Sequence, residues 1–147
     1  MKDQKLIIKN LGVEAKKAAN ELANINQEKK NLALNNLKKK LKLISADLIT
    51  VNKKDIINAQ SLNLTSAMID RLTLTEERIS GMINSLEEII NLSDPVGIVL
   101  SEWSRPNGLR IEKITTPIGV IGIIFESRPN VTVDASAIAM KAGNAVI

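Results

Sequence analysis

The chain has 147 residues, of which 44% are hydrophobic and 24% charged, and it carries a net charge of +4. These values are typical of one soluble globular domain, and they exclude a disordered or fibrous chain. Cysteine and histidine are both absent, which excludes disulfides, the usual zinc sites, a thiol nucleophile and a histidine base. We therefore expect no metal site. No apolar run approaches the ~18 residues of a membrane span and none resembles a secretory signal, so we expect a cytoplasmic protein without membrane association.

Two amphipathic helices are predicted at the start of the chain, because apolar residues recur there at spacings of four and three. Residues 1–54 also contain 13 lysines against five acidic residues, a balance that would suit nucleic acid. However, no aromatic side chain is interleaved with these lysines, and Lys38, Lys39, Lys40 and Lys42 fall on the wet side of the second stripe. We therefore expect solvated helix faces and no nucleic-acid partner. The first stripe comprises Leu11, Ala15, Ala18, Leu22 and Ile25, and the second comprises Leu34, Leu37, Leu41, Ile44 and Leu48.

A third helix is predicted for residues 76–92. Thr75 is expected to cap its amino terminus, and Glu76 and Glu77 suit the positive end of the helix dipole. Pro95 should end the helix, because the residue before a proline is disfavoured in helical geometry. The predicted apolar face comprises Ile79, Met82, Ile83, Leu86 and Ile90.

The sequence then changes to a β-hairpin pattern. Residues 98–103 are predicted to form a strand, and residues 105–108 (RPNG) a turn in which Pro106 has the preferred φ. Residues 109–114 alternate apolar with charged side chains and form the return strand. This pattern predicts a hairpin with one solvent-facing side.

A strand, a helix and another strand are predicted for the last thirty residues. Residues 117–126 (PIGVIGIIFE) are almost continuously apolar, as expected for a parallel strand covered on both faces. Residues 131–142 form the helix, Gly143 suits the position just after it, and residues 144–147 begin the next strand. This is a βαβ unit, for which a right-handed crossover is expected. Because a native chain rarely ends inside a central strand, we also expect the sequence to be a truncated piece of a longer protein.

Two glycines in the predicted strand carry no nucleotide signal. Gly119 and Gly122 lie within residues 117–126, whereas a dinucleotide fingerprint follows a strand and opens a helix. We expect them instead to let another element pack closely against the sheet.

The candidate site follows the predicted strand. Ligands of open parallel sheets bind beyond the carboxyl ends of the strands, where this sequence has Glu126-Ser127-Arg128-Pro129-Asn130. Asn130 could donate its amide N–H to a developing oxyanion. Alternatively, Asn130 caps the following helix, while Arg128 pairs with Glu126 or remains in solvent.

Three collinear segments identify a resemblance. Residues 68–79 (MIDRLTLTEERI), 92–97 (LSDPVG) and 109–147 closely resemble γ-glutamyl phosphate reductases, a branch of the aldehyde dehydrogenase superfamily. The most specific part is PIGVIGIIFESRPNVT, because general aldehyde dehydrogenases have Pro-Trp-Asn where this chain has Arg128-Pro129-Asn130. The resemblance is weakest in the lysine-rich first third.

The resemblance implies an α/β, aldehyde dehydrogenase-like fold and a reaction. The family reduces L-glutamyl 5-phosphate to L-glutamate 5-semialdehyde with NADPH and releases phosphate, which is the second step of proline biosynthesis from glutamate. In this reaction a cysteine thiolate attacks the acyl phosphate, and the resulting thioester accepts a hydride. By the match, Asn130 takes the oxyanion position. The residues expected on the nicotinamide side of the cofactor cleft are Ile124, Phe125, Glu126, Ser127, Arg128 and Pro129.

The resemblance also implies a division of the chain. Residues 1–94 would be a helical part of the cofactor domain, residues 95–116 the hairpin, and residues 117–147 an incomplete first βαβ unit, with the catalytic domain and its cysteine absent. The chain by itself should then be inactive. For the full-length protein we expect a homo-oligomer with a functional link to glutamate 5-kinase.

Two alternatives remain open. One is a non-catalytic, basic helical interaction module that contains a reductase-like segment. The other is the reductase half of a bifunctional kinase–reductase, although no kinase-like sequence precedes the matching region.

Overall fold

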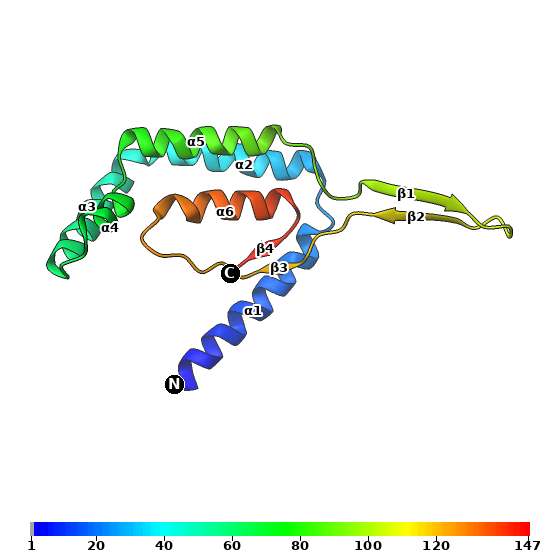
Figure 1. The fold of residues 1–147 in the computed structure, drawn as a ribbon, viewed down its shortest axis with the longest axis horizontal. Coiled ribbons are helices and arrows are strands. Elements are labelled where there is room, and N and C mark those ends of the chain that lie inside the picture. Colours follow the sequence, from blue (N-terminus) through cyan, green and yellow to red (C-terminus); the bar gives the residue numbers. More distant parts are fainter. Residues whose placement is uncertain (1) are drawn as a thin grey trace.

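The computed structural model describes residues 2–147. Helices fill the first two thirds of the chain, a hairpin follows, and a short βαβ unit completes the described part (Figure 1). None of the helices in this range is long and apolar enough to cross a bilayer. In chain order the elements are α1 (Lys2–Leu22), α2 (Gln27–Leu43), α3 (Ser45–Ser61), α4 (Ser66–Leu72), α5 (Glu76–Asn91), β1 (Val99–Ser104), β2 (Arg110–Ile114), β3 (Val120–Ile121), α6 (Pro129–Lys141) and β4 (Ala145–Val146).

Helices α2, α5 and α6 form the main core. α2 and α5 run side by side and α6 packs against both (Figure 1). Leu34 of α2 and Leu86 of α5 are completely buried, and each contributes about 1.5–3 kcal/mol through the apolar area that it removes from water. The buried members of this core are Leu34, Leu41, Leu86, Ile89 and Ala137.

The prediction of two helices before residue 76 was incomplete. The second stripe divides at Ile44, so that Leu41 lies in α2 and Leu48 in α3. The backbone at Ile44 departs from helical geometry with φ −100° and ψ 13°, but hydrogen bonding continues across it from Ile44 to Lys40 and from Leu48 to Ile44. A bend that keeps this bonding leaves the apolar spacing unbroken, so the spacing did not reveal the boundary.

Helix α4 was missed because it is short and lacks buried residues of its own. It is capped by Thr65 and held from α3 by Asn52, whose side chain is buried. The amide of Asn52 donates to the Leu72 carbonyl at 2.9 Å and accepts from the Leu74 N–H at 2.7 Å. Asn52 therefore ties the connection between α4 and α5 to α3.

The prediction for α5 was confirmed. The helix spans Glu76–Asn91, and the Thr75 hydroxyl accepts from the Arg78 N–H at 3.1 Å. Ile79, Met82 and Leu86 are buried as expected. Ile89, which was not on the predicted face, is also buried because α6 covers that side of the helix.

The hairpin was correctly predicted, but its burial was not. β1 and β2 pair antiparallel, and the Gly108 N–H closes the turn on the Arg105 carbonyl at 2.9 Å. Every residue of β1 is exposed, and in β2 only Ile111 is half-buried. The hairpin projects away from the helices (Figure 1), so both of its faces are solvent-exposed in this chain rather than one.

The βαβ unit was confirmed with shorter strands than predicted. β3 pairs in parallel with β4, and ladder hydrogen bonds reach only from Gly119 to Ile123. The two strands lie between α1 and α6, yet Ile118 and Ile124 are 84% and 102% exposed. Residues 117–126 are therefore not covered on both faces along their length, and β4 is their only strand partner among residues 2–147.

The glycines of this unit act through backbone conformation. Gly143 has φ +74° and ends α6 with a Schellman motif, in which the N–H groups of Gly143 and Asn144 donate to Met140 and Ala139. A Cβ at Gly143 would lie 2.8 Å from the Pro117 side chain. A Cβ at Gly119 or Gly122 would meet no neighbouring atom within 4 Å, so the expected close packing is not formed within the described chain.

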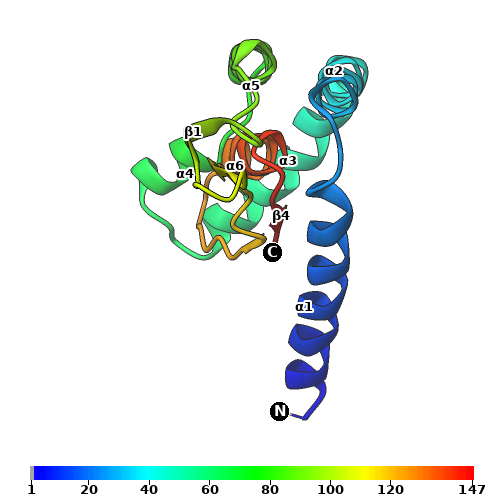
Figure 2. The same ribbon diagram turned by 90° about the vertical axis from the view of Figure 1, so that its right-hand side faces the viewer.

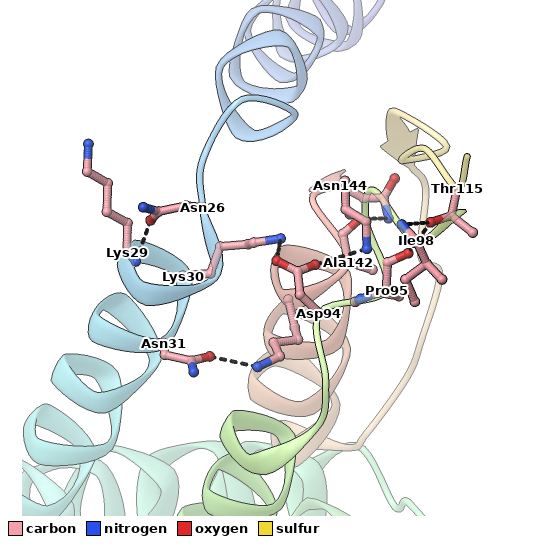
Figure 3. Close-up of polar contacts among 12 residues, drawn as sticks. Asn26, Lys29, Lys30, Asn31, Asp94, Pro95, Ile98, Thr115, Ala142 and Asn144 are labelled. Carbon is pink, nitrogen blue, oxygen red and sulfur yellow. Dashed lines mark hydrogen bonds and ion pairs between the residues drawn. The ribbon is translucent and has the colours of Figure 1, made fainter. Parts of the chain in front are cut away.

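A buried polar cluster joins α2, the loop after α5 and α6 (Figure 3). Lys30 and Lys141 are each 2% exposed. The Lys30 ammonium lies 2.5 Å from the Asp94 carboxylate, while the Lys141 ammonium donates to the Asn31 side chain at 2.7 Å and to the Ile90 carbonyl at 2.9 Å. Each buried charge therefore has a polar partner, as burial requires.

The cluster shifts two pKa values. Burial raises the pKa of Asp94, but the hydrogen bonds from Lys30 and the Val96 N–H, together with the charges of Lys30 and Lys141, outweigh it, so this pKa lies below its usual range. Burial lowers the pKa of Lys141, an effect that the Lys30 charge strengthens and the Asp94 charge opposes.

We predict that Asp94→Asn destabilises the chain by about 3 kcal/mol near pH 7, because Lys30 then keeps a buried charge without a counter-ion. The pKa of Asp94 is depressed in the folded state. Its contribution to the free energy of unfolding is therefore present above about pH 4 and is lost as the pH falls through the folded-state pKa. The difference in Tm between parent and variant, followed by circular dichroism, should therefore shrink below about pH 4. The control Glu87→Gln breaks the more exposed pair with Lys38 and should cost less than about 1 kcal/mol; equal losses for both variants would contradict the assignment.

Candidate active site

The backbone turns sharply between β3 and α6. Ser127 has φ +49°, a left-handed conformation that is unusual for a residue with a Cβ. Arg128 follows as the N-cap without a side-chain cap, and Pro129 takes the first helical position, where its fixed φ is favourable. The turn aims the start of α6, including Asn130, back toward α4 and α5.

Asn130 is not the helix cap. It is the second residue of α6, and its side-chain Nδ2 donates to Asp134 Oδ2 at 3.1 Å. The capping interpretation is therefore wrong. Because an amide NH₂ group has two hydrogens, the bond to Asp134 leaves one N–H of Asn130 for another acceptor.

The interpretation of Arg128 left two options open, a pair with Glu126 or a position in solvent. Among the ion pairs formed by residues 2–147, none joins Arg128 to Glu126. Glu126 is exposed, and Arg128 makes no hydrogen bond or ion pair with another side chain of the described residues. Arg128 therefore corresponds to the solvent-facing alternative.

Asn130 lines a cavity of about 490 Å³ between α4, α5 and the start of α6. Arg128 and Pro129 also line this cavity, whereas Ile124, Phe125, Glu126 and Ser127 do not. Ile124 and Phe125 are exposed on the stretch before the turn. The structure thus brings the second half of the predicted segment to one cavity and leaves the first half on the surface beside it.

The sequence did not predict the part of this cavity that is lined by α4, α5 and the second turn of α6. It is formed by Arg71, Arg78, Ser85 and Asp134 among others. Asp134 could have been found, since it lies four residues after Asn130 on the same helical face. Arg71 could not, because α4 was not predicted.

The two arginines of α4 and α5 differ in their surroundings. Arg78 Nη2 pairs with Asp70 Oδ1 at 2.9 Å, and its Nη1 donates to the Asp70 carbonyl and, at 2.8 Å, to the Thr73 carbonyl. These contacts use Arg78 to hold the end of α4. Within the described chain, Arg71 takes part in no ion pair, so its guanidinium is available to a ligand in the cavity.

Comparisons with known proteins agree with the resemblance identified from the sequence. γ-Glutamyl phosphate reductases from Bartonella henselae, Bartonella tribocorum and Brucella suis are 49%, 50% and 47% identical to this chain over 140, 137 and 146 residues, which is 95%, 93% and 99% of its length. The chain spans about a third of the length of these curated relatives, 34–35% in each case. No protein-family model matches it.

Solved structures confirm the fold. The γ-glutamyl phosphate reductase of Thermotoga maritima superposes with a TM-score of 0.87 at 39% identity, over 90% of this chain and 32% of that one. The Saccharomyces cerevisiae enzyme gives 0.85 at 32% identity, over 90% of this chain and 34% of that one. The predicted resemblance and the α/β fold class are therefore confirmed.

We predict that Ser127→Gly leaves stability unchanged or raises it by up to about 1 kcal/mol, because glycine adopts positive φ without strain, whereas Ser127→Val lowers it by about 1–2 kcal/mol. Urea unfolding midpoints measure both effects. Ser136, an exposed residue of α6, is the matched control. There glycine should cost about 0.5–1 kcal/mol and valine less than that; the same order of preference at both positions would refute the assigned conformation of Ser127.

Proposed function

We propose that this chain is part of a γ-glutamyl phosphate reductase, an enzyme that reduces L-glutamyl 5-phosphate to L-glutamate 5-semialdehyde with NADPH and releases phosphate in proline biosynthesis. The similarity to named reductases over 93–99% of the chain supports this assignment. The chain represents about a third of such an enzyme, so the activity is proposed for the whole protein.

The observation that carries the proposal is the placement of Asn130. Its side chain lines the cavity, keeps one N–H free of Asp134, and lies at the amino terminus of α6, where the helix dipole favours negative charge. Attack on an acyl phosphate and hydride transfer to a thioester both place negative charge on the former carbonyl oxygen. A fixed N–H donor stabilises that oxygen more in the transition state than in the ground state.

The nucleophile has to come from outside these residues. The attacking thiolate forms a bond to the glutamyl C5 carbon, and the C5–O bond to phosphate breaks. Hydride addition to the thioester then expels the thiolate and gives the semialdehyde. None of the 147 residues is cysteine, so this chain contributes oxyanion stabilisation and binding surface.

The strand end offers a surface that suits the cofactor. NADPH, when bound, supplies the hydride. Ile124 and Phe125 are exposed apolar side chains directly beyond β3, and with Glu126, Ser127, Arg128 and Pro129 they form the stretch that leads to Asn130. We assign this stretch to the nicotinamide side, since an apolar surface beside the oxyanion donor would hold a flat ring and exclude water from the reacting carbon.

The finer biological assignments rest on the same resemblance. We place the complete enzyme in the cytoplasm as a homo-oligomer that acts after glutamate 5-kinase, with residues 1–94, 95–116 and 117–147 as its helical, hairpin and first βαβ parts. The rival interpretation, a basic interaction module, is disfavoured because two of the lysines are engaged internally: Lys30 with Asp94 and Lys38 with Glu87.

The function is tested with a chimaera in which residues 1–147 replace the matching segment of the Bartonella henselae reductase. We predict that the chimaera supports growth of a reductase-deficient, proline-requiring bacterium without added proline, whereas this chain by itself shows no turnover because it lacks a thiol. A soluble, cooperatively unfolding chimaera that fails where the parent Bartonella enzyme succeeds would contradict the proposal. Turnover by the purified chain above a mock preparation would contradict the second part.

In the same chimaera, Asn130→Ala should lower kcat by roughly 10²–10³ with little change in KM, because one preorganised oxyanion donor is lost. Turnover and Tm are both measured, with Ser136→Ala on the exposed face of α6 as the control. If Asn130 serves only to bond Asp134, its loss should cost about 1 kcal/mol of stability and leave turnover within about threefold of the parent; that result would refute the oxyanion role.

A further inference from the structure

Two charged groups in the cavity are not used by the proposed chemistry. Asp134 lines the cavity, and its Oδ1 is buried without a hydrogen-bond donor among the described residues. Arg71 lines the same cavity and takes part in no ion pair of residues 2–147. Asp70, the residue before Arg71, is paired with Arg78. Neither Arg71 nor Asp134 takes part in that ion pair.

The carboxylate of Asp134 lacks part of its hydrogen bonding. Its Oδ2 accepts from Asn130 at 3.1 Å, while its Oδ1 has no donor among residues 2–147. Buried carboxylate oxygens in native proteins are normally paired, because leaving one unpaired is costly. Asp134 lines the cavity, and each carboxylate oxygen has about two lone pairs, so the carboxylate can accept from a cationic group in the cavity while Asn130 keeps its contact.

The spacing along α6 matches the proposed substrate. Asn130 and Asp134 lie one helical turn apart, with about 5–6 Å between their Cβ atoms. In L-glutamyl 5-phosphate, two methylene groups separate the reacting carbonyl carbon from the carbon that bears the ammonium and carboxylate groups. A substrate whose carbonyl oxygen meets Asn130 can therefore bring its ammonium group to Asp134.

We propose that Asp134 binds the ammonium group of the substrate and that Arg71 binds its α-carboxylate, so that this cavity selects an amino-acid chain over a simple aldehyde or acyl phosphate. This inference rests on the proposed function. The guanidinium fork of Arg71 suits a carboxylate, and a carboxylate is the usual partner of an ammonium group. The pair thus determines specificity, while Asn130 acts at the reacting carbon.

A purely structural role for Asp134 makes a different prediction. If Asp134 only orients Asn130, its loss would slow the reaction of every substrate to the same extent. If it binds the ammonium group, its loss would slow only substrates that carry that group. Only those substrates would lose a contact with the carboxylate.

The test uses the chimaera in the oxidative direction, with NADP⁺ and phosphate. Three substrates are compared: L-glutamate 5-semialdehyde, 5-oxopentanoate, which lacks the ammonium group, and 4-aminobutanal, which lacks the carboxylate. Each substrate is compared with itself across variants, so differences between substrates in ring closure cancel. Glu88→Gln, at an exposed carboxylate of α5 outside the cavity, is the control.

Asp134→Asn should lower kcat/KM for the semialdehyde and for 4-aminobutanal by roughly 10- to 100-fold, and for 5-oxopentanoate by less than about threefold. Arg71→Lys keeps the charge but loses the two-pronged geometry of the guanidinium group. It should lower kcat/KM for the semialdehyde and 5-oxopentanoate by roughly tenfold and change kcat/KM for 4-aminobutanal by less than about threefold. The control should change none of the three. Equal losses on all substrates would overturn the assignment.

The unmodified chimaera provides a test that needs no variant. It should prefer L-glutamate 5-semialdehyde over 5-oxopentanoate by roughly 10-fold or more in kcat/KM, when the semialdehyde concentration is taken as that of its open-chain form. An active chimaera without this preference overturns the assignment of Asp134 and leaves the proposed function standing. A folded chimaera that oxidises none of the three substrates overturns both.

Discussion

Lys30 and Lys141 are each only 2% exposed, so both ammonium groups need partners inside the protein. Asp94 in the loop after α5 pairs with Lys30, and Asn31 and the Ile90 carbonyl accept from Lys141. These contacts tie the carboxyl end of α6 to α2 and α5 at one point. Because a helix is stiff, fixing one end also fixes where the other end lies, and that other end carries Asn130 and the cavity. Viewed from the end of the helices, α6 lies below both α5 and α2 (Figure 2).

Local signals in the sequence predicted what local interactions determine. The Thr75 cap, the hairpin turn at Gly108 and the end of α6 at Gly143 were predicted because each depends on a few neighbouring residues. Burial was predicted less well, because it depends on what covers an element. Residues 117–126 have the composition of a central strand, yet only the part beside β4 is paired. The exposed hairpin shows the same limit.

The candidate site followed a similar division. Asn130 was accessible to sequence reasoning because it lies between a predicted strand and a predicted helix. Arg71 was not, because its place at the cavity depends on how the fold brings α4 to the start of α6, which lies far away in the sequence. Lys30 was hidden for another reason: in a sequence it resembles any other lysine of a basic helix, and only the fold brings Asp94 to it.

The buried cluster also implies an order of assembly. Lys30 and Asp94 can meet once α5 and the loop after it have been synthesised. Lys141 reaches the cluster only after the hairpin and β3 have been made, and its contact with Asn31 spans 110 residues. Loop-closure entropy makes such long-range contacts late steps of folding. Until α6 arrives, the α2–α5 pair exposes Leu34 and Leu86 to water, so a nascent chain must pass through a stage in which its main core is open on one side.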